Sequence, residues 1–402
     1  MLTLQPAPRP QRHLRPRIGL ALAGGGPLGA FYEIGALQAI AECCEGVELT
    51  DLDVYVGVSS GAMIAAGLAN GFTTADMGVV FIDNAAEEYP MSPGLLMQPA
   101  FHEYLARVKG APGLLRAIAR QYLNAPSPGA WAAAIEPLGR LVPTGLFDNR
   151  PMERSIRHIF STHGRSNDFR TLKRRLYVVA TDLDGGREVR FGAPGQDHVP
   201  ISKAIQASTA LPGLYPPVMI NGHTCVDGAL LRTMHASIAL EHGATLVICV
   251  NPLVAFDAYA TGRRSTELTR GGLPVVMNQT FRSLIQSRMQ VGMGAYRGRF
   301  PTSDMLLFEP DRSDEAMFFV NIFRYSDRRR VVEHSYQRTR ADLRRRARTL
   351  APLLARHGLR LRRDVLNDPH RTFHAAAIDR RREFGPVGGR LGAALDRLEA
   401  LL

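Results

Sequence analysis

The 402-residue chain has the composition of a globular protein, with 45% hydrophobic and 21% charged residues. This composition argues against collagen, extended disorder and a disulfide scaffold. Lysine and arginine outnumber acidic residues by 49 to 37, and the formal net charge of +12 predicts an anionic partner, either membrane headgroups or nucleic acid. No stretch reaches the ~18 continuous apolar residues that a transmembrane helix needs.

The first 17 residues are rich in proline and arginine and have no apolar core. We therefore interpret residues 1–17 as a disordered leader and not as a signal peptide. Cys43, Cys44, Cys225 and Cys249 show no spacing typical of a zinc site, and adjacent cysteines rarely form a bridge with each other. These features predict reduced cysteines in a cytoplasmic protein.

Two strand–turn–helix units are predicted in the first seventy residues. Ile18–Leu22 and Val54–Val58 are short, continuously apolar runs, and each is followed by a segment with apolar residues at helical spacing. Repeated units of this kind are typical of an α/β fold with a mainly parallel sheet. We expect a three-layer α/β/α arrangement.

The remaining chain predicts further strands between mostly helical regions. The region of about 87–165 is expected to be a helical insertion, and its apolar cluster Leu95–Met97 is a candidate wall or lid of a binding pocket. We assign 18–255 to one domain, 256–370 to a helical extension and 371–402 to a basic, loosely ordered tail. The later strands are expected at Leu176–Ala180, Glu188–Phe191, Val218–Ile220, Thr224–Val226 and Leu246–Val250.

Arginines are concentrated in the last hundred residues. They form either an ordinary solvated helix face or, where they alternate with apolar residues around 328–348, a helix that lies on anionic lipid. Nucleic acid is not expected, because interleaved aromatic residues and recognised binding modules are not evident. Oligomeric state cannot be inferred from these patterns.

The strongest local motif is Gly57-Val58-Ser59-Ser60-Gly61, at the junction of a predicted strand and helix. A G-x-S-x-G segment here makes a sharp turn that presents the serine hydroxyl above the sheet, and Gly57 and Gly61 relieve clashes across it. Ser59 is thus a candidate nucleophile, with a simple helix N-cap as the alternative. The side chain of Ser60 is expected to point away from the pocket.

A glycine-rich loop, Gly24-Gly25-Gly26-Pro27-Leu28-Gly29, follows the first predicted strand. Its backbone N–H groups could stabilise the oxyanion of an ester's tetrahedral intermediate. The same residues match the dinucleotide-binding pattern G-x-G-x-x-G. That alternative requires an acidic residue at the end of the next strand, where this chain has Ser59, so we disfavour it.

Asp227 ends a short predicted strand and is followed by Gly228 and Ala229. A carboxylate can orient and deprotonate a serine directly if it lies within hydrogen-bond distance. The alternative for an Asp-Gly pair is a surface turn.

Together these three motifs, in this order, resemble the patatin-like phospholipase family. Ala180–Leu183 and Ala207–Pro212 match it as well, so the resemblance covers roughly residues 18–255. It implies a lipid acyl hydrolase with Ser59 as nucleophile, Asp227 as proton acceptor and an oxyanion hole at Gly24, Gly25, Gly26 and Gly29. It also implies phospholipids or other acyl lipids as substrates, peripheral contact with a membrane, and no metal or cofactor.

Two departures qualify this resemblance. Family members usually carry a basic residue where this chain has Leu28, so the oxyanion hole would depend on backbone N–H groups alone. After the aspartate, Arg232–His235 replaces an Asn-rich turn, which puts the local geometry there in doubt. A non-catalytic lipid or protein binder with the same fold remains an alternative.

Two other features have simpler explanations. His235 and His242 could complete a Ser–Asp–His triad, but a nucleophile at residue 59 leaves few preceding strands for an α/β-hydrolase, and we interpret them as helix residues beside the sheet. Asp182–Gly186 begins like a calcium loop but has Gly192 where the loop needs glutamate, so a β-hairpin turn is predicted.

Overall fold

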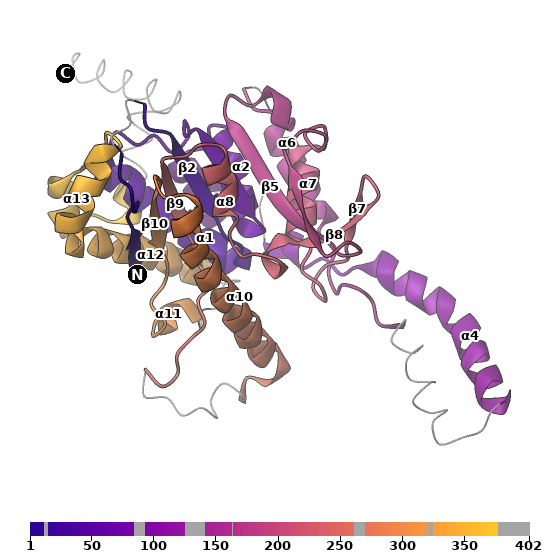
Figure 1. Ribbon diagram of the computed structural model, residues 1–402. Coiled ribbons are helices and arrows are strands. Elements are labelled where there is room, and N and C mark those ends of the chain that lie inside the picture. The colour runs from indigo at the N-terminus through magenta and orange to yellow at the C-terminus, as the bar shows by residue number, and fades with distance from the viewer. Residues whose placement is uncertain are drawn as a thin grey trace, which may run out of the picture.

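The computed structural model describes residues 1–11, 15–83, 93–124, 141–162, 164–260, 270–318, 320 and 325–376. A central sheet lies between two layers of helices (Figure 1), which confirms the expected α/β/α architecture. Within the described residues the main sheet has nine strands, ordered β1-β10-β9-β2-β4-β5-β8-β7, with β6 paired to β5. The strands are β1 (Leu2–Gln5), β2 (Ile18–Leu22), β4 (Val54–Val58), β5 (Arg175–Asp182), β6 (Arg187–Phe191), β7 (Val218–Ile220), β8 (His223–Asp227), β9 (Leu246–Val250) and β10 (Asp304–Phe308).

The centre of the sheet is parallel and its edges are antiparallel. The five strands from β10 to β5 run in the same direction, and β2 and β4 are buried along their whole length. Continuous apolar runs are expected in such strands, since helices cover both faces. β5 and β6 form the hairpin predicted at Asp182–Gly186. A separate two-stranded sheet pairs β3 (Cys44–Glu45) with β11 (Arg360–Leu361).

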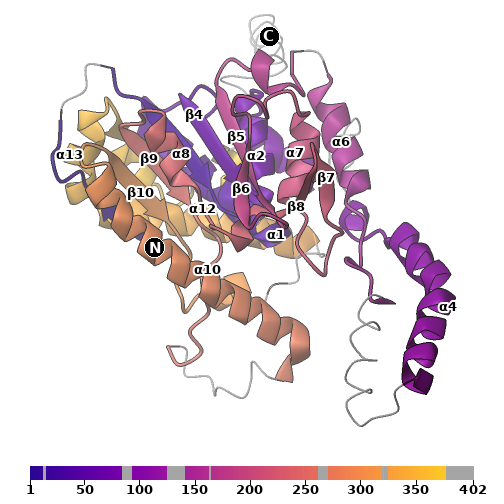
Figure 2. The same cartoon turned by 45° about the vertical axis from the view of Figure 1, so that its right-hand side comes forward.

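Helices cover the two faces of the sheet unequally. On one face, α1 contacts α2 and lies along α12, while α7 packs on β5 and α6; on the other, α8 and α10 cover the sheet (Figure 2). The helices are α1 (Gly26–Cys43), α2 (Ser60–Ala69), α3 (Thr74–Met77), α4 (Phe101–Asn124), α6 (Arg150–Phe160), α7 (Ile201–Ser208), α8 (Ala236–Glu241), α10 (Gly272–Arg299), α11 (Glu315–Phe318), α12 (Tyr325–Arg345), α13 (Ala347–Arg356) and α14 (Arg363–Asn367), with shorter turns η1 (Gly78–Asp83), η2 (Pro93–Leu96), η4 (Phe169–Thr171) and η5 (Gly228–Leu230).

The expected disordered leader is wrong in part, because its first residues form β1. β1 pairs antiparallel with β10, and the Leu2 side chain is completely buried. The alternation of Leu2 and Leu4 with polar residues fits a strand with one face buried, a signal that the neighbouring prolines and arginines obscured.

The boundary drawn at residue 255 is also wrong. β10 comes from the region expected to be a helical extension, yet it lies inside the main sheet between β1 and β9. Leu306 and Phe308 of β10 and Val332 and Tyr336 of α12 belong to the same hydrophobic core as α1. This region therefore completes the α/β/α body and is not an appendage to it.

The basic helix α12 is a core helix with an exposed arginine-bearing side. Arg328 and Arg340 are 3% and 5% exposed, although both belong to the segment expected to face solvent or lipid. Arg340 donates to the carbonyl oxygen of Asp368 at 2.7 Å, so it fastens the following segment to the helix. Contact with anionic lipid through the exposed arginines stays a prediction.

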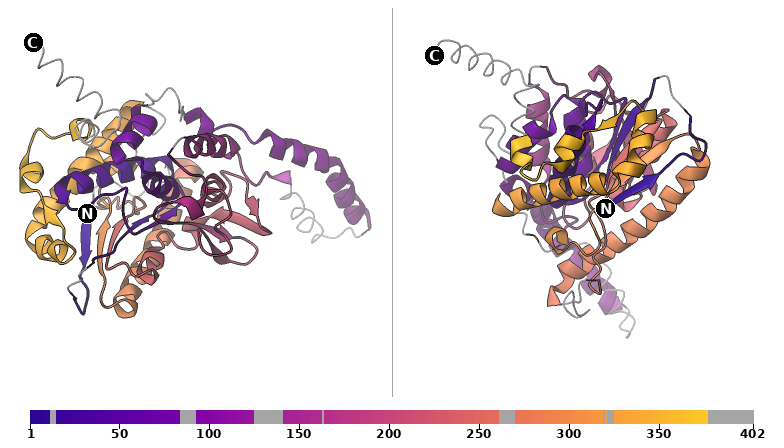
Figure 3. Two further views of the ribbon diagram at one scale, coloured as in Figure 1. Left: turned by 90° about the horizontal axis from the view of Figure 1, so that it is seen from above. Right: turned by 90° about the vertical axis from the view of Figure 1, so that its left-hand side faces the viewer.

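The expected helical insertion is described in part. α4 extends away from the layered body (Figures 1 and 3), whereas α6 packs against α7. Residues 125–140 of the expected insertion lie outside the described residues, as does the tail beyond residue 376. Before residue 376, Phe373 is buried against the core, so this part of the expected loose tail is ordered. In the described parts of the chain, no helix combines the length and apolarity needed to cross a bilayer.

Candidate active site

Ser59 occupies a strained turn between β4 and α2. Its backbone has φ 52° and ψ −124°, a conformation that residues with a side chain rarely adopt and that costs roughly 1–3 kcal/mol. The flanking glycines make the turn possible: a Cβ atom on Gly57 would lie 2.4 Å from Ala62 Cα, and one on Gly61 would lie 2.6 Å from the Ala23 carbonyl oxygen. The predicted elbow is therefore present, with a steric reason for both glycines.

Ser208, at the end of α7, holds this turn in place. The Ser59 backbone N–H donates to Ser208 Oγ at 2.8 Å, and the Ser208 hydroxyl donates to the Val179 carbonyl oxygen at 2.6 Å. The sequence placed Ser208 in a matching stretch but did not predict this role. The contact joins residues 149 positions apart, and no local pattern reveals such a partner.

The hydroxyl of Ser59 meets the carboxylate of Asp227, which ends β8. Ser59 Oγ donates to Asp227 Oδ2 at 2.7 Å, while Asp227 Oδ1 accepts the Ala229 backbone N–H at 2.8 Å. Both side chains are buried, with exposed fractions of 6% and 4%. Burial raises the pKa of Asp227 to about 6 despite the two hydrogen bonds, which act in the opposite direction. The carboxylate is thus ionised at neutral pH and can accept the serine proton.

The glycine loop lies directly over this pair. A Cβ atom on Gly24 would come 2.9 Å from Ser59 Cβ, so only glycine allows the loop this close. Gly26 has φ +59° and begins α1, so the second half of the predicted glycine loop belongs to this helix. The first N–H groups of a helix have no helical acceptor and carry partial positive charge, so they suit a developing oxyanion.

The structure corrects the expected role of Gly29. Its N–H donates to the Gly25 carbonyl oxygen at 3.0 Å and is used within the first turn of α1. A Cβ atom on Gly29 would lie 2.9 Å from Pro252 Cγ and 3.1 Å from Ser60 Oγ. Gly29 therefore allows close packing, and the available donors of the loop lie at Gly24–Gly26.

A largely apolar cavity of about 700 Å³ opens at Ser59 and Asp227. Its volume is within the range of small-molecule sites. The expected Leu95–Met97 cluster contributes two residues, whereas the contribution of α10 was not anticipated. The apolar lining includes Phe31, Met63, Phe81, Leu95, Leu96, Leu146, Met152, Leu214, Leu253, Leu273, Met277, Phe281 and Ile285.

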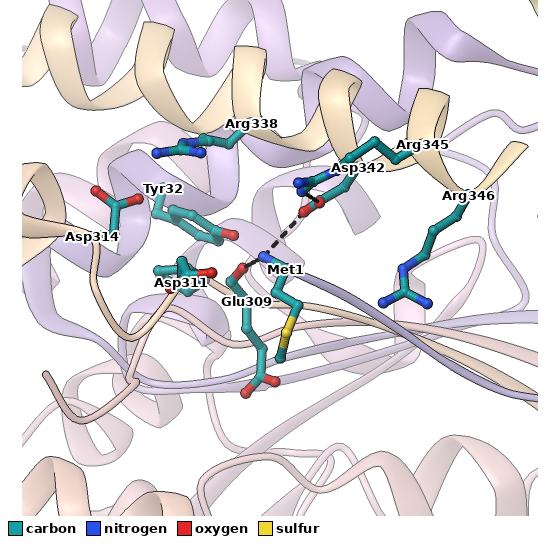
Figure 4. Close-up of a pocket in the computed structure, with 10 residues that line it drawn as sticks. Met1, Tyr32, Glu309, Asp311, Asp314, Arg338, Asp342, Arg345 and Arg346 are labelled. Carbon is teal, nitrogen blue, oxygen red and sulfur yellow. Dashed lines mark hydrogen bonds and ion pairs between the residues drawn. The ribbon is translucent and has the colours of Figure 1, made fainter. Parts of the chain in front are cut away.

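A second cavity, of about 380 Å³, lies beside α12 at the start of β1 (Figure 4). Among its charged groups, Asp342 pairs with the Met1 nitrogen at 3.1 Å and with Arg345. None of its described lining residues is a serine, threonine, cysteine or histidine. The cavity at Ser59 is therefore the candidate active site.

Comparison with known proteins assigns the family. The model of the patatin-like phospholipase family matches residues 20–240, more than half of the chain. The chain belongs to the patatin-like phospholipase family. This match includes Ser59, Asp227 and the glycine loop, and it supports lipid acyl hydrolysis in general terms.

Solved structures with similarity to this patatin-like chain include two bacterial proteins. VipD from Legionella pneumophila is 18% identical, with a TM-score of 0.32, over 64% of this chain and 53% of that one. ExoU, in its complex with SpcU from the type III secretion system of Pseudomonas aeruginosa, is 17% identical, with a TM-score of 0.26, over 93% and 67%. The chain thus spans about half the length of the VipD chain.

The two histidines considered for a triad flank α8 of the patatin-like domain and do not line the cavity. His235 is buried and lies 3.0 Å from Glu188, and His242 stacks on Tyr177 with ring centroids 4.8 Å apart. Since Asp227 contacts Ser59 directly, the geometry offers a Ser–Asp pair and gives no support to the triad.

Other expectations about this patatin-like site are refined. Leu28, at the position where the family usually has a basic residue, packs against the hydrophobic core. Ser60 was expected to point away, but it lines the cavity, and its buried Oγ has no hydrogen-bond partner among the described residues. Beyond Ala229, Thr233 and Met234 are buried beside α10, so this unusual segment is well packed.

Proposed function

We propose that this protein hydrolyses acyl esters of phospholipids or related lipids with a Ser59–Asp227 dyad. The observation that carries the proposal is the 2.7 Å hydrogen bond from Ser59 Oγ to Asp227 Oδ2 at an apolar cavity. A carboxylate within this distance can take the hydroxyl proton as the oxygen attacks a carbonyl carbon.

In the first step, Ser59 Oγ forms a bond to the acyl carbonyl carbon and its proton passes to Asp227. The carbonyl oxygen becomes an oxyanion, which the N–H groups at Gly24–Gly26 stabilise; each such donor contributes roughly 3 kcal/mol. When the intermediate collapses, the bond to the alkoxide leaving group breaks, and Asp227 returns its proton to that oxygen.

In the second step, water attacks the acyl-enzyme while Asp227 accepts a proton from it. The fatty acid leaves and the Ser59 hydroxyl is restored. The apolar lining, including Leu96 and Phe281, suits a long acyl chain, because burial of each methylene group contributes about 0.8 kcal/mol. The surrounding structure, including the hydrogen bond from the Ser59 N–H to Ser208 Oγ, holds the nucleophile in this strained geometry before substrate binds.

Two measurements test the proposal. A fluorophosphonate probe should label the wild-type protein and the Ser59→Ala variant should remain unlabelled, while Ser283→Ala, on the exposed side of α10, keeps the label. In mixed bilayers, wild type should release fatty acids and lysolipids that Ser59→Ala does not. Absence of labelling and of lipid turnover would favour a non-catalytic binder, and stabilisation by a dinucleotide would instead favour the nucleotide-binding alternative.

A further inference from the structure

A buried cation lines the candidate active site. Arg282 projects from α10 into the lining of the cavity at Ser59, and 7% of its surface is exposed. It lies outside the segment that matches the family model. A buried charge is strongly unfavourable unless a group of opposite charge compensates it.

The protein itself supplies little of this compensation. Arg282 Nε donates to Asn278 Oδ1 at 3.2 Å, and Nη1 donates to the Val254 carbonyl oxygen at 3.2 Å. The guanidinium also lies 5.2 Å from the ring centroid of Phe318. A guanidinium has five N–H donors, so these bonds leave three without an acceptor among the residues that the structure describes. Across the described ranges, no carboxylate lies within ion-pair distance of Arg282.

The segment that follows β9 contacts both Arg282 and the glycine loop. It is bonded to Val254, which follows β9 by a few residues, and the intervening Leu253 lines the cavity. Pro252, two residues before Val254, packs against the loop: its Cγ lies 2.6 Å from the place where a Cβ atom on Gly25 would stand. One short segment therefore connects the cation to the donors that would hold the oxyanion.

Charge and shape together describe a ligand. Burial lowers the pKa of Arg282 to about 10, so the guanidinium remains charged at neutral pH. Arg328 of α12 adds a second cationic side chain to the lining, and it donates to the Phe81 carbonyl oxygen at 3.4 Å. The rest of the lining is largely apolar. A molecule with an acyl chain and an anionic group near its ester matches both the apolar lining and the two cationic side chains.

We propose that Arg282 binds the phosphate group of a phospholipid or lysophospholipid substrate. This inference rests on the proposed function and adds a headgroup requirement to it. The guanidinium presents its free N–H groups to the phosphate oxygens, as arginine does in bidentate phosphate recognition. The bound phosphate compensates the buried charge and aligns the neighbouring ester with Ser59.

The test compares two substrates that share an acyl chain, lysophosphatidylcholine and the corresponding monoacylglycerol. Arg282→Gln should lower kcat/KM for lysophosphatidylcholine by on the order of 10- to 100-fold, mainly through KM, and leave the monoacylglycerol within about twofold. Arg282→Lys, which keeps the charge, should lie between wild type and Arg282→Gln. Arg297→Gln, on an exposed site of the same helix, is the matched control and should behave as wild type.

A binding measurement tests the phosphate site without relying on enzymatic turnover, and a second substitution at Arg282 guards against misfolding of the first. In the Ser59→Ala background, calorimetry with an alkyl phosphocholine ether should show about tenfold weaker binding when Arg282 is changed to Gln or Met, with a melting temperature no lower than that of the Ser59→Ala parent, because the change removes a buried charge. Equal loss for both substrates, or no change in binding, would overturn the phosphate assignment. The phosphate assignment would also be overturned if Arg282→Gln relieved product inhibition by free fatty acid but left hydrolysis of lysophosphatidylcholine unchanged. The anion bound by Arg282 would then be a carboxylate. If wild type does not hydrolyse lipid esters but the binding difference is still measured, the proposed function is rejected and the phosphate-binding site stands.

Discussion

Replacing Asp227 with asparagine is expected to abolish ester hydrolysis and to stabilise the fold above about pH 6. Burial raises the pKa of this carboxyl from 3.8 to about 6, a shift of roughly two units. At 1.36 kcal/mol per unit, the native state disfavours the ionised form by about 3 kcal/mol relative to the unfolded chain. Asparagine keeps an oxygen for the Ala229 N–H and has no charge to bury.

The sign of the effect follows from the raised pKa. Below about pH 4 the Asp227 carboxyl is protonated in both the folded and the unfolded state, so it does not lower the free energy of unfolding. Between pH 4 and 6 the unfolded chain releases the proton first, so wild type loses stability as the pH rises, and the loss is complete above pH 6. The advantage of Asp227→Asn should therefore grow from near zero at pH 4 to as much as about 3 kcal/mol at pH 8.

Urea denaturation from pH 4 to pH 8 measures this difference, with Asp364→Asn as a control. Asp364 is exposed and paired with Arg362, which lowers its pKa, so that variant should gain nothing as the pH rises. In parallel, wild-type kcat/KM should fall about tenfold per pH unit below pH 6, because a protonated Asp227 cannot accept the serine proton. A pH-independent stability gap, or full activity at pH 4.5, would refute the reasoning.

Four further substitutions probe the turn at Ser59, the two histidines and the apolar wall of the cavity. Gly61→Ala should abolish activity or prevent folding, since its Cβ atom would lie 2.6 Å from the Ala23 carbonyl oxygen; a soluble, active variant would contradict the steric argument. His235→Ala and His242→Ala should each keep kcat within about tenfold of wild type if the dyad is sufficient, whereas a triad predicts losses of several orders of magnitude. Leu96→Ala should reduce kcat/KM for long-chain esters more than for short-chain esters, as it shortens an apolar wall, and equal losses for both would reject that wall.

Local sequence was most informative where a motif and its function occupy consecutive residues. The strands Ile18–Leu22 and Val54–Val58 have the same bounds in the structure, and Ser59 lies in the predicted turn. Continuous apolar runs specify buried parallel strands, and glycine spacing specifies a turn that larger residues would block. The order of the three motifs also indicated the family, which the family model confirms.

Prediction from sequence failed for strands whose neighbouring residues hide the apolar pattern, and for contacts between residues far apart in the chain. β1 was missed because it has only four residues and stands among prolines and arginines, and β10 was missed because it lies in a region interpreted as a helical extension. Their burial depends on each other, since β10 lies between β1 and β9, and only pairing in the sheet determines it. Likewise, an arginine-rich helix is ambiguous until its neighbours are known, and α12 proved to be packed against α1.

The sequence by itself therefore determined the nucleophile's turn, the glycine loop and the parallel centre of the sheet, because each depends on residues adjacent in the chain. The family resemblance implied that Asp227 acts on Ser59, but only the tertiary structure gave their direct hydrogen bond, the Ser208 contact that holds the turn, and the place of Arg282 in the same cavity. These contacts depend on how strands and helices far apart in the chain are brought together. Burial then altered the chemistry, because it moved the pKa of Asp227 toward neutrality and, within the described part of the chain, left Arg282 with unused donors.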